Sequence, residues 1–247
     1  MQFDLDLLTV NLWGLPWPVA RHRGGRGRRF LEHLRDRSYD LVGIQELWWP
    51  WRRSAKRAPM HVPKSRRDSG LALAGRLHLG ETRVEHFRDH GGVDSLKRKG
   101  VLRARAQSPA GAELSVAVVH LQAGRRNGAL RSRQLEQLLA ALESECRPVV
   151  LMGDFNFYAG VAEDQQSAHR LGSAGFADAA LALGRCEATF VASNPYVPRW
   201  HRPERFDRVY LRDAGGVALR PLETEVVRTE RPLSDHHPLR ARVRVSA

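Results

Sequence analysis

The stretch VVLMGDFN, residues 149–156, guides the interpretation of the whole chain. Four apolar residues of strand length lead into Gly153, which permits a tight turn. An acid and an amide follow at Asp154 and Asn156, and in extended chain two side chains at this spacing point to the same face. An Asx turn after an ordinary strand would show the same residues. The combination favours a functional pair at the rim of a sheet.

Three more apolar runs stop at a polar side chain. Residues 7–10 lead to Asn11, residues 41–44 lead to Gln45 and Glu46, and residues 114–119 lead to His120. Short β-branched runs that end in this way place the polar group at the edge of a sheet. Further strands are predicted over residues 69–75, 83–88, 100–107, 206–212, 222–228 and 239–245.

Two apolar stripes at helical spacing lie between these strands. One is formed by Phe30, Leu31 and Leu34 in an arginine-rich segment, and a clearer one runs from Leu130 to Leu142. Many strands with few helices between them indicate two sheets packed on each other with helices outside. No shift in composition divides the 247 residues, so we expect a single domain over residues 1–247.

Net charge and chain ends limit the partners and the compartment. The charge of +13 favours polyanions or anionic surfaces, although the dominance of arginine over lysine is also typical of a GC-rich genome. Cys146 and Cys186 fit neither metal-ligand spacing nor a disulfide framework. The sequence begins without an export signal and has no apolar run of membrane-spanning length. We therefore expect a cytoplasmic monomer, with secretion open if a leader has been removed.

Hydrolysis of a phosphate ester would explain the residues at the strand ends. The phosphate anion repels hydroxide, so its charge is usually neutralised by Mg²⁺ or Mn²⁺. Mg²⁺ prefers oxygen ligands and binds through one or two carboxylates. A base must activate the attacking water, and a cationic donor must stabilise the charge that grows on phosphate. Acids, amides and histidines at strand ends supply these groups.

The motif SDHHP, residues 234–238, offers an acid beside a histidine before the terminal strand. A surface loop rich in Ser, Asp and Pro is an equally good interpretation of this motif alone. Single residues have plain alternatives too. Glu46 fits a solvated acid and Asn11 a turn former, whereas His120 fits a satisfied core histidine. Asp207 fits a strand acid paired with an arginine.

As a set, these residues occur in the order of the endonuclease/exonuclease/phosphatase superfamily, which the chain resembles over nearly its whole length. The resemblance is carried by Asn11, Gln45-Glu46, His120, Gly153-Asp154-Phe155-Asn156, Asp207 and Ser234-Asp235-His236. It implies the α/β class and a four-layer α/β/β/α sandwich of two packed mixed sheets flanked by helices. The site would lie at one end of the two sheets.

The resemblance implies a metal side and a phosphate side. On the metal side, Glu46 would be the principal ligand of Mg²⁺, or of Mn²⁺, with Asn11 and Asp235 beside it. The residues implied to do the chemistry on the phosphate side are Asp154, Asn156, His120, His236 and Asp207. Asp154 would activate water, Asn156 and His120 would contact phosphate, and His236 would stabilise it while held by Asp207.

Within the superfamily, residues 9–16, 38–48, 94–102 and 120–123 look most like the neutral sphingomyelinases. That likeness implies a phosphodiesterase that acts on a sphingomyelin-type phospholipid. A DNA or RNA nuclease on the same scaffold is the alternative, because phosphate contacts dominate nucleic-acid affinity and the chain is basic. An inactive binding module is a third interpretation, disfavoured because every expected catalytic position is occupied.

Four further residues are expected to bind substrate. In the sphingomyelinases an acid and a lysine five residues apart, here Asp94 and Lys99, form a switch near the site; a solvated charged loop is the alternative. Trp48 and Tyr196 offer aromatic faces for a quaternary ammonium. The tryptophans after residue 47 also suit peripheral contact with a membrane surface, or else simple packing within the loop.

Overall fold

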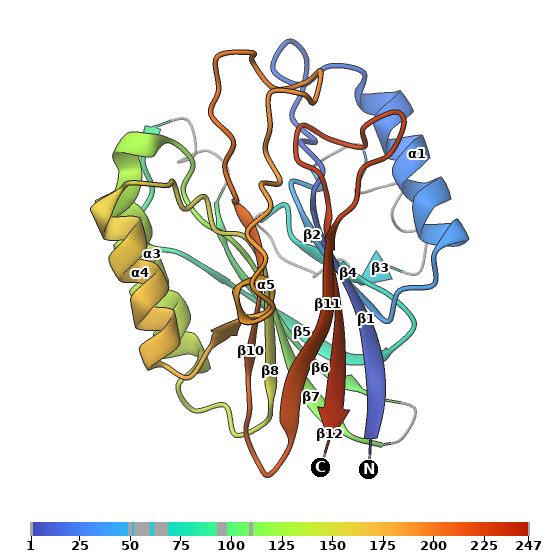
Figure 1. Ribbon diagram of the computed structural model, residues 1–247, viewed down its shortest axis with the longest axis vertical. Helices are drawn as coiled ribbons and strands as arrows, with labels where there is room; N and C mark the ends of the chain where they lie inside the picture. Colours follow the sequence, from blue (N-terminus) through green and yellow to red (C-terminus); the bar gives the residue numbers. More distant parts are fainter. Residues whose placement is uncertain are drawn as a thin grey trace.

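The apolar runs of the sequence form the inner strands of two sheets that pack face to face (Figure 1). The computed structural model describes residues 2–48, 51, 60–61, 69–92, 98–108 and 111–246. Each sheet has six strands in the described part of the chain. Both sheets are mixed, because a parallel pair at the centre of each is flanked by antiparallel neighbours.

The first sheet has the strand order β11-β12-β1-β2-β4-β3. Its members are β1 (Gln2–Asn11), β2 (Leu41–Gln45), β3 (Met60–His61), β4 (Ala72–Ala74), β11 (Ala218–Val226) and β12 (Leu239–Ser246). The first and last strands of the chain are neighbours, since β1 pairs antiparallel with β12. β1 and β2 run parallel, with Asn11 beside Gln45 at their carboxyl ends.

The second sheet has the order β5-β6-β7-β8-β10-β9. Its members are β5 (His78–His86), β6 (Gly100–Gln107), β7 (Glu113–His120), β8 (Val149–Asp154), β9 (Ala177–Asp178) and β10 (Asp207–Arg212). β7 and β8 run parallel with His120 beside Asp154, and antiparallel β10 places Asp207 on the other side of Asp154. His120, Asp154 and Asp207 are therefore neighbours on adjacent strands at the same end of the sheet.

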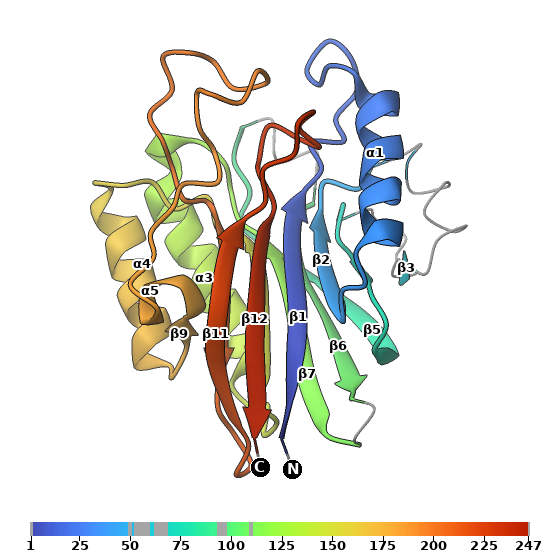
Figure 2. The ribbon, with the colours of Figure 1, turned by 45° about the vertical axis from the view of Figure 1, so that its right-hand side comes forward.

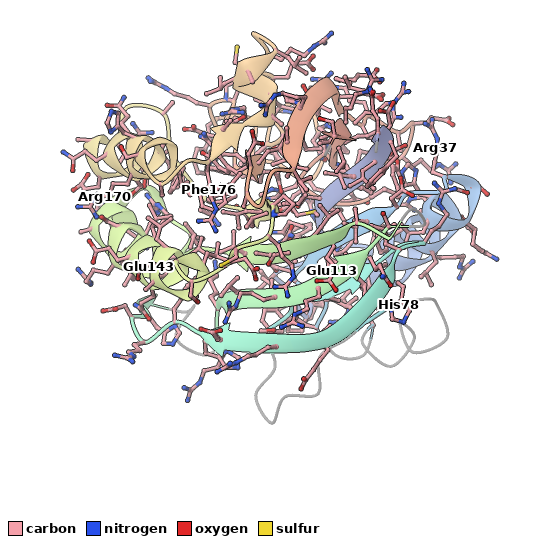
Figure 3. All side chains as sticks on the ribbon, turned by 90° about the horizontal axis from the view of Figure 1, so that it is seen from below. Arg37, His78, Glu113, Glu143, Arg170 and Phe176 are labelled. Atoms are coloured by element: carbon pink, nitrogen blue, oxygen red, sulfur yellow. The ribbon has the colours of Figure 1, made fainter. Side chains whose placement is uncertain are left out.

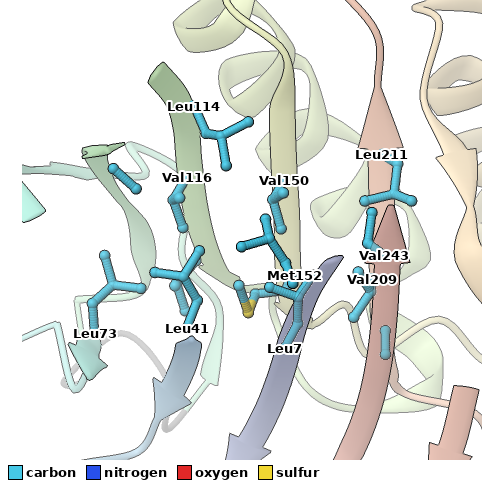
Figure 4. Close-up of a cluster of buried hydrophobic side chains, with 14 of the residues drawn as sticks. Leu7, Leu41, Leu73, Leu114, Val116, Val150, Met152, Val209, Leu211 and Val243 are labelled. Atoms are coloured by element: carbon cyan, nitrogen blue, oxygen red, sulfur yellow. The ribbon is translucent and has the colours of Figure 1, made fainter. Parts of the chain in front are cut away.

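Alternation along the buried strands divides the apolar residues between two cores. Leu7 of β1 and Val150 and Met152 of β8 face the space between the sheets, which Figure 4 shows filled by apolar side chains from both. Leu8 faces the opposite side of β1, and Leu151 the opposite side of β8. Strands buried on both faces read as continuous apolar runs, and this explains the unbroken runs in the sequence.

Helices cover the outer face of each sheet. α1 (Arg23–Asp36) packs on the first sheet through Phe30, and α3 (Gly128–Leu142) packs on the second through Leu135 and Leu138. α4 (Ala162–Ser173) lies beside α3, and the short helices η2 (Arg125–Asn127) and α5 (Ala179–Ala182) lie in connections. In Figures 1 and 2, α1 is on one side of the sheets, with α3 and α4 on the other.

Figure 3 shows the same layering along the long axis. Glu143 and Arg170 mark the helix pair on one side, and Arg37 marks the end of α1 on the other. The four-layer α/β/β/α sandwich expected from the resemblance is therefore confirmed. No helix in the described ranges is both long enough and apolar enough to cross a membrane.

Some element bounds differ from those expected. The strand expected at residues 69–75 is only Ala72–Ala74, and β5 begins earlier than expected, at His78. The helix α4 was not expected, because its buried face consists of Asp164, Ser167 and Leu171 and has no apolar stripe. Asp164 is buried there as the bidentate partner of Arg131, with N–O distances of 2.7 and 2.8 Å.

The absence of a side chain at Gly153 lets the backbone of β8 lie close to that of β7. Its φ is +147°, and a Cβ there would lie 2.0 Å from the backbone oxygen of Val119. We expect Gly153→Ala to lower the free energy of unfolding by about 3 kcal/mol, because one of the two backbones must move. Urea denaturation measures this change.

Gly172→Ala is the matched control for that variant. Gly172 lies in α4, and a methyl group added to its Cα would have nothing within 4 Å, so the change should stabilise the protein by up to about 1 kcal/mol. Equal unfolding free energies for Gly153→Ala and the wild type would contradict the close β7–β8 contact.

Candidate functional site

A buried carboxylate, that of Asp154, stands at the centre of the polar cluster. Its Oδ2 accepts a 2.9 Å hydrogen bond from Nδ2 of Asn11, which belongs to the other sheet. The same oxygen lies 3.4 Å from Nε2 of His120 and 3.9 Å from Nε2 of His236. Asp154 is 1% exposed. The ends of β1, β7 and β8 therefore meet at one acid.

Asn156 is held close to Asp154 by the turn that follows β8. Its backbone N–H donates to Oδ1 of Asp154 at 2.9 Å, and its side-chain Nδ2 donates to the carbonyl of Leu121 at 3.1 Å. The Asx turn that the sequence offered as the plain interpretation is thus present. It coexists with the clustering, because the turn fixes one oxygen of Asp154 and leaves the other facing Asn11 and the histidines.

His236 is oriented by a chain of buried groups. Its Nδ1 lies 2.8 Å from Oδ2 of Asp207, and that oxygen also accepts a 2.6 Å hydrogen bond from the hydroxyl of Thr189. The rings of Phe190 and Phe206 pack on the imidazole with centroid distances of 5.0 and 5.9 Å. Nε2 of His236 consequently points toward Asp154 and the centre of the site.

Burial and neighbouring charges set opposite protonation states for these two groups. Burial raises the pKa of Asp154 to about 6, against the lowering effect of His236. Burial alone would lower the pKa of His236, but the carboxylates of Asp207 and Asp154 outweigh it and raise that pKa to about 10. Near neutral pH the site therefore pairs a carboxylate of unusual basicity with an imidazolium, an arrangement typical of acid–base chemistry.

Glu46 lies beside Asn11, and its charge acts on Asp235, so these two acids form a second acidic group in the site. Oε1 of Glu46 lies 3.4 Å from Nδ2 of Asn11, and its buried Oε2 has no hydrogen-bond partner among the described residues. Burial, against the lowering effect of His236 and with a further contribution from the charge of Glu46, raises the pKa of Asp235 to about 6. Glu46 also has a φ of +55°, which is uncommon for a residue with a side chain.

These observations fit a divalent cation between Glu46 and Asp235. A buried carboxylate oxygen without a donor, close enough to another acid to raise that acid's pKa, is costly unless a cation compensates it. In the described ranges no group of three or more His, Cys, Asp or Glu side chains is arranged to hold a metal, but Mg²⁺ needs only one or two carboxylates. Asn11 presents its nitrogen to the cluster, because its Oδ1 accepts from the backbone of Trp13 at 2.8 Å. Ligation through Asn11 therefore requires the amide to turn.

The residues expected to bind substrate lie in different surroundings. Lys99 is 1% exposed, with Nζ 2.9 Å from Nε2 of His120, so it belongs to the cluster and is no solvated loop residue. Tyr196 packs against Trp13 at 5.8 Å and is half-buried. The ring of Trp48 lies against Gly70. Asp94 lies outside the described residues.

Arg26 of α1 is a site-supporting residue that sequence patterns did not reveal. Its side chain is fully buried and donates to the carbonyls of Leu12 at 2.6 Å, Trp13 at 2.9 Å and Arg21 at 2.8 Å. A longer contact of 3.4 Å reaches the carbonyl of Leu233, two residues before Asp235. One guanidinium thus ties the loop after Asn11 to the loop that carries Asp235.

Aromatic rings enclose the same guanidinium. Its Cζ lies 5.0, 5.4 and 5.5 Å from the ring centroids of Trp13, Trp51 and Tyr196. Trp51 is therefore a packing residue, as the plainer interpretation of that tryptophan run proposed. Arg26, Thr189, Phe190 and Asn194 escaped prediction because each acts through contacts distant in sequence. Asn194 donates to the carbonyls of Ser234 and Asp235 at 2.8 and 3.1 Å.

The chain belongs to the endonuclease/exonuclease/phosphatase family, whose sequence pattern matches residues 8–236. This confirms the superfamily resemblance drawn from the motifs. No curated protein matches the sequence. The three activities in the family's description are all hydrolyses of phosphate esters. The residue types at the strand ends indicated the same chemistry.

Solved structures of TDP2, of a sphingomyelinase and of a bacterial toxin share the fold. D. rerio TDP2 complexed with a single-strand DNA product has a TM-score of 0.81 at 20% identity, covering 97% of this chain and 98% of that one. Sphingomyelinase C from Streptomyces griseocarneus has a TM-score of 0.71 at 20% identity, covering 96% and 98%. Beta toxin 275-280 from Staphylococcus aureus has 0.72 at 16%, covering 96% and 99%. At these identities the likeness establishes the fold.

Arg26→Lys should uncouple the two loops, because an ammonium cannot reach the same carbonyls as the planar guanidinium. We expect it to lower the free energy of unfolding by about 3 kcal/mol, since several buried carbonyls lose their donors. Arg28→Lys on the exposed side of the same helix should change it by less than about 0.5 kcal/mol. Equal effects of the two changes in urea denaturation would contradict the role of Arg26.

Asp207→Asn should lower the pKa of His236, because the carboxylate of Asp207 is the strongest influence raising it. A histidine stays protonated below its pKa, so the alkaline limb of kcat/KM against pH should move to lower pH in the variant. Asp213→Asn, which alters an exposed ion pair with Arg220, is the control. An alkaline limb in the same place for both variants would show that activity does not depend on protonated His236.

Proposed function

We propose that this chain is a Mg²⁺-dependent phosphodiesterase that hydrolyses a phosphate ester by attack of water. The observation that carries the proposal is the contact of Asp154 with Asn11, His120 and His236 in one buried cluster. Membership of the endonuclease/exonuclease/phosphatase family supports the reaction class. The pair of Glu46 and Asp235 supports the cation.

Each residue type has a task in that reaction. Asp154, with its pKa raised to about 6, accepts the proton of the attacking water. His236 stays protonated and donates through Nε2 to a phosphate oxygen, while Asp207 keeps its ring in place. Lys99 and His120, 2.9 Å apart, bring a second cationic group to the phosphate. A cation held by Glu46 and Asp235 would neutralise the phosphate charge.

A phospholipid of the sphingomyelin type is the proposed substrate. Two observations support this substrate. Residues 9–16 and 94–102 resemble the neutral sphingomyelinases, and the fold is like that of sphingomyelinase C. An aromatic pair also lies beside the metal side. The backbone N–H of Trp13 bonds to Asn11, and the Trp13 ring packs 5.8 Å from that of Tyr196. Aromatic faces suit a quaternary ammonium headgroup.

Nucleic acid is the second candidate substrate. The fold is also that of D. rerio TDP2, whose structure is described as complexed with a single-strand DNA product, and the chain carries a net charge of +13. A panel separates the two: sphingomyelin, lysophospholipid, phosphoinositides, abasic DNA, single-stranded DNA and a chromogenic diester, each with Mg²⁺ and with EDTA. Release of phosphocholine from sphingomyelin alone among the natural substrates supports the lipid, and cleavage of DNA alone overturns it.

Asp154→Asn should lower kcat on the favoured substrate by about two to four orders of magnitude, the usual contribution of a positioned acid or base. The change keeps the volume and the hydrogen bond from the Asn156 backbone but removes the acceptor of the Asn11 bond. Urea denaturation of the variant therefore accompanies the rate measurement, to show that it is folded. Asp178→Asn, at a buried acid that caps α5 outside the cluster, is the control. A near-normal rate for Asp154→Asn would refute the assignment of Asp154 as the base.

A further inference from the structure

We infer that two loops at the site end of the molecule form an interfacial anchor that inserts into the surface of a phospholipid bilayer. The loops are residues 12–22, after β1, and residues 191–203, before β10; together they are called the rim loops. Their tips present Trp17 at 83% exposure, Val19 at 57% and Trp200 at 81%. The inference rests on the proposed action on a phospholipid and says how that site reaches its substrate.

The two rim loops form one surface. The guanidinium of Arg21 donates to the carbonyl of Pro195 at 3.4 Å, and the hydroxyl of Tyr196 lies 3.4 Å from Nδ1 of His22. The packing of Trp13 on Tyr196 joins their bases. In Figures 1 and 2 both loops project at the end opposite the two termini, beyond the carboxyl end of β1.

The exposed side chains stand on ordered backbone. The N–H groups of Val19 and Ala20 both bond to the carbonyl of Pro16, which makes a tight turn around Trp17. Near Trp200, the N–H of His201 bonds to the carbonyl of Pro198 at 2.9 Å. Side chains presented by preformed turns lose little backbone entropy when they insert, so most of the gain from burying an indole is retained.

Aromatic stacking connects the anchor to the catalytic cluster. Trp200 packs on His201 at 5.8 Å, His201 packs on Phe190 at 4.7 Å, and Phe190 packs on His236 at 5.0 Å. Insertion of Trp200 at the headgroup level would therefore set the depth at which His236 and Asp154 meet a lipid phosphate.

The charge of these segments matches a phospholipid surface. Residues 12–31 contain five arginines and no acid, and residues 188–203 contain Arg199 and Arg202 and no acid. Arg21, Arg199 and Arg202 are exposed around the tips. Tryptophan collects at the membrane–water interface, and each nearby arginine adds attraction to an anionic leaflet.

The composition of the tips favours lipid over nucleic acid. Trp17 stands between Pro16 and Pro18, and Val19 follows, all of them exposed. Proline and valine add apolar area to a bilayer contact but have no π face for stacking a base. Membrane contact and packing within the loop were the two interpretations of the tryptophans at residues 48–51. Trp48 and Trp51 are half-buried and pack on Gly70 and Arg26. The anchor is therefore assigned to Trp200, which was also a sequence candidate for membrane contact, and to Trp17, which was not.

Vesicle sedimentation in EDTA tests the anchor without turnover. The probes are vesicles of pure phosphatidylcholine and vesicles of phosphatidylcholine with a minor fraction of phosphatidylserine. The wild-type chain should sediment with both, more strongly with phosphatidylserine present. The double variant Trp17→Ser/Trp200→Ser should partition about tenfold more weakly, because it loses two large apolar side chains. Leu181→Ser, at an apolar residue of α5 that is 55% exposed, is the matched control and should bind like the wild type.

Three results would overturn the anchor: no sedimentation of the wild type, equal binding of the double variant, or an equal loss in the Leu181 control. If the double variant instead loses binding to a single-stranded oligonucleotide while vesicle binding is absent throughout, the surface serves nucleic acid. Failure of the wild-type chain to hydrolyse a soluble chromogenic diester would contradict the proposed function, and the vesicle measurement would still decide the anchor.

Discussion

The hydrogen bond from Asn11 to Asp154 joins the two sheets at the point where the chemistry is assembled. Its length is 2.9 Å, and it links the last residue of β1 to the last residue of β8. A carboxylate as deeply buried as that of Asp154 is tolerated only with compensating partners. Asn11 supplies one from the first sheet and His120 supplies a polar neighbour from the second. His236, in the connection between β11 and β12, supplies a cationic neighbour.

Charge balance explains how the rest of the site is arranged around this bond. On one side, Asp207 holds His236 as an imidazolium against Asp154. On the other side, the charges of Glu46 and Asp235 influence each other, and the buried charge of Arg26 acts on both acids. The unusual backbone of Glu46 is tolerated because the surrounding loops hold it. The side with His236 suits the phosphate group of an ester, and the side with Glu46 and Asp235 suits a cation that neutralises the phosphate charge.

Sequence reasoning reached the two packed sheets and the strand-end members of the cluster for a simple physical reason, whereas the family resemblance supplied the four layers and the roles of Asp207, Asp235 and His236. Strands buried on both faces leave continuous apolar runs, and a polar residue that ends such a run, like Asp154 or His120, lies at the sheet edge. The register of parallel pairs then brings those ends together, as with His120 beside Asp154. The contributions of Arg26 and Thr189 left no such mark. Arg26 is one of many arginines and Thr189 is an ordinary loop threonine. Their roles are visible only in the structure, where Arg26 donates to distant backbone carbonyls and Thr189 donates to Asp207.

The central claim, that the strand ends surround a divalent cation, is tested most directly by diffraction from crystals soaked in Mn²⁺ and measured for anomalous scattering. The account predicts a single strong anomalous peak within bonding distance of the Glu46 carboxylate, about 2.0–2.2 Å from an oxygen as is usual for small divalent cations. It also predicts that Asp235 lies in the same coordination sphere or binds it through water. A peak bound elsewhere, or no peak with Glu46 fully ordered, would contradict it.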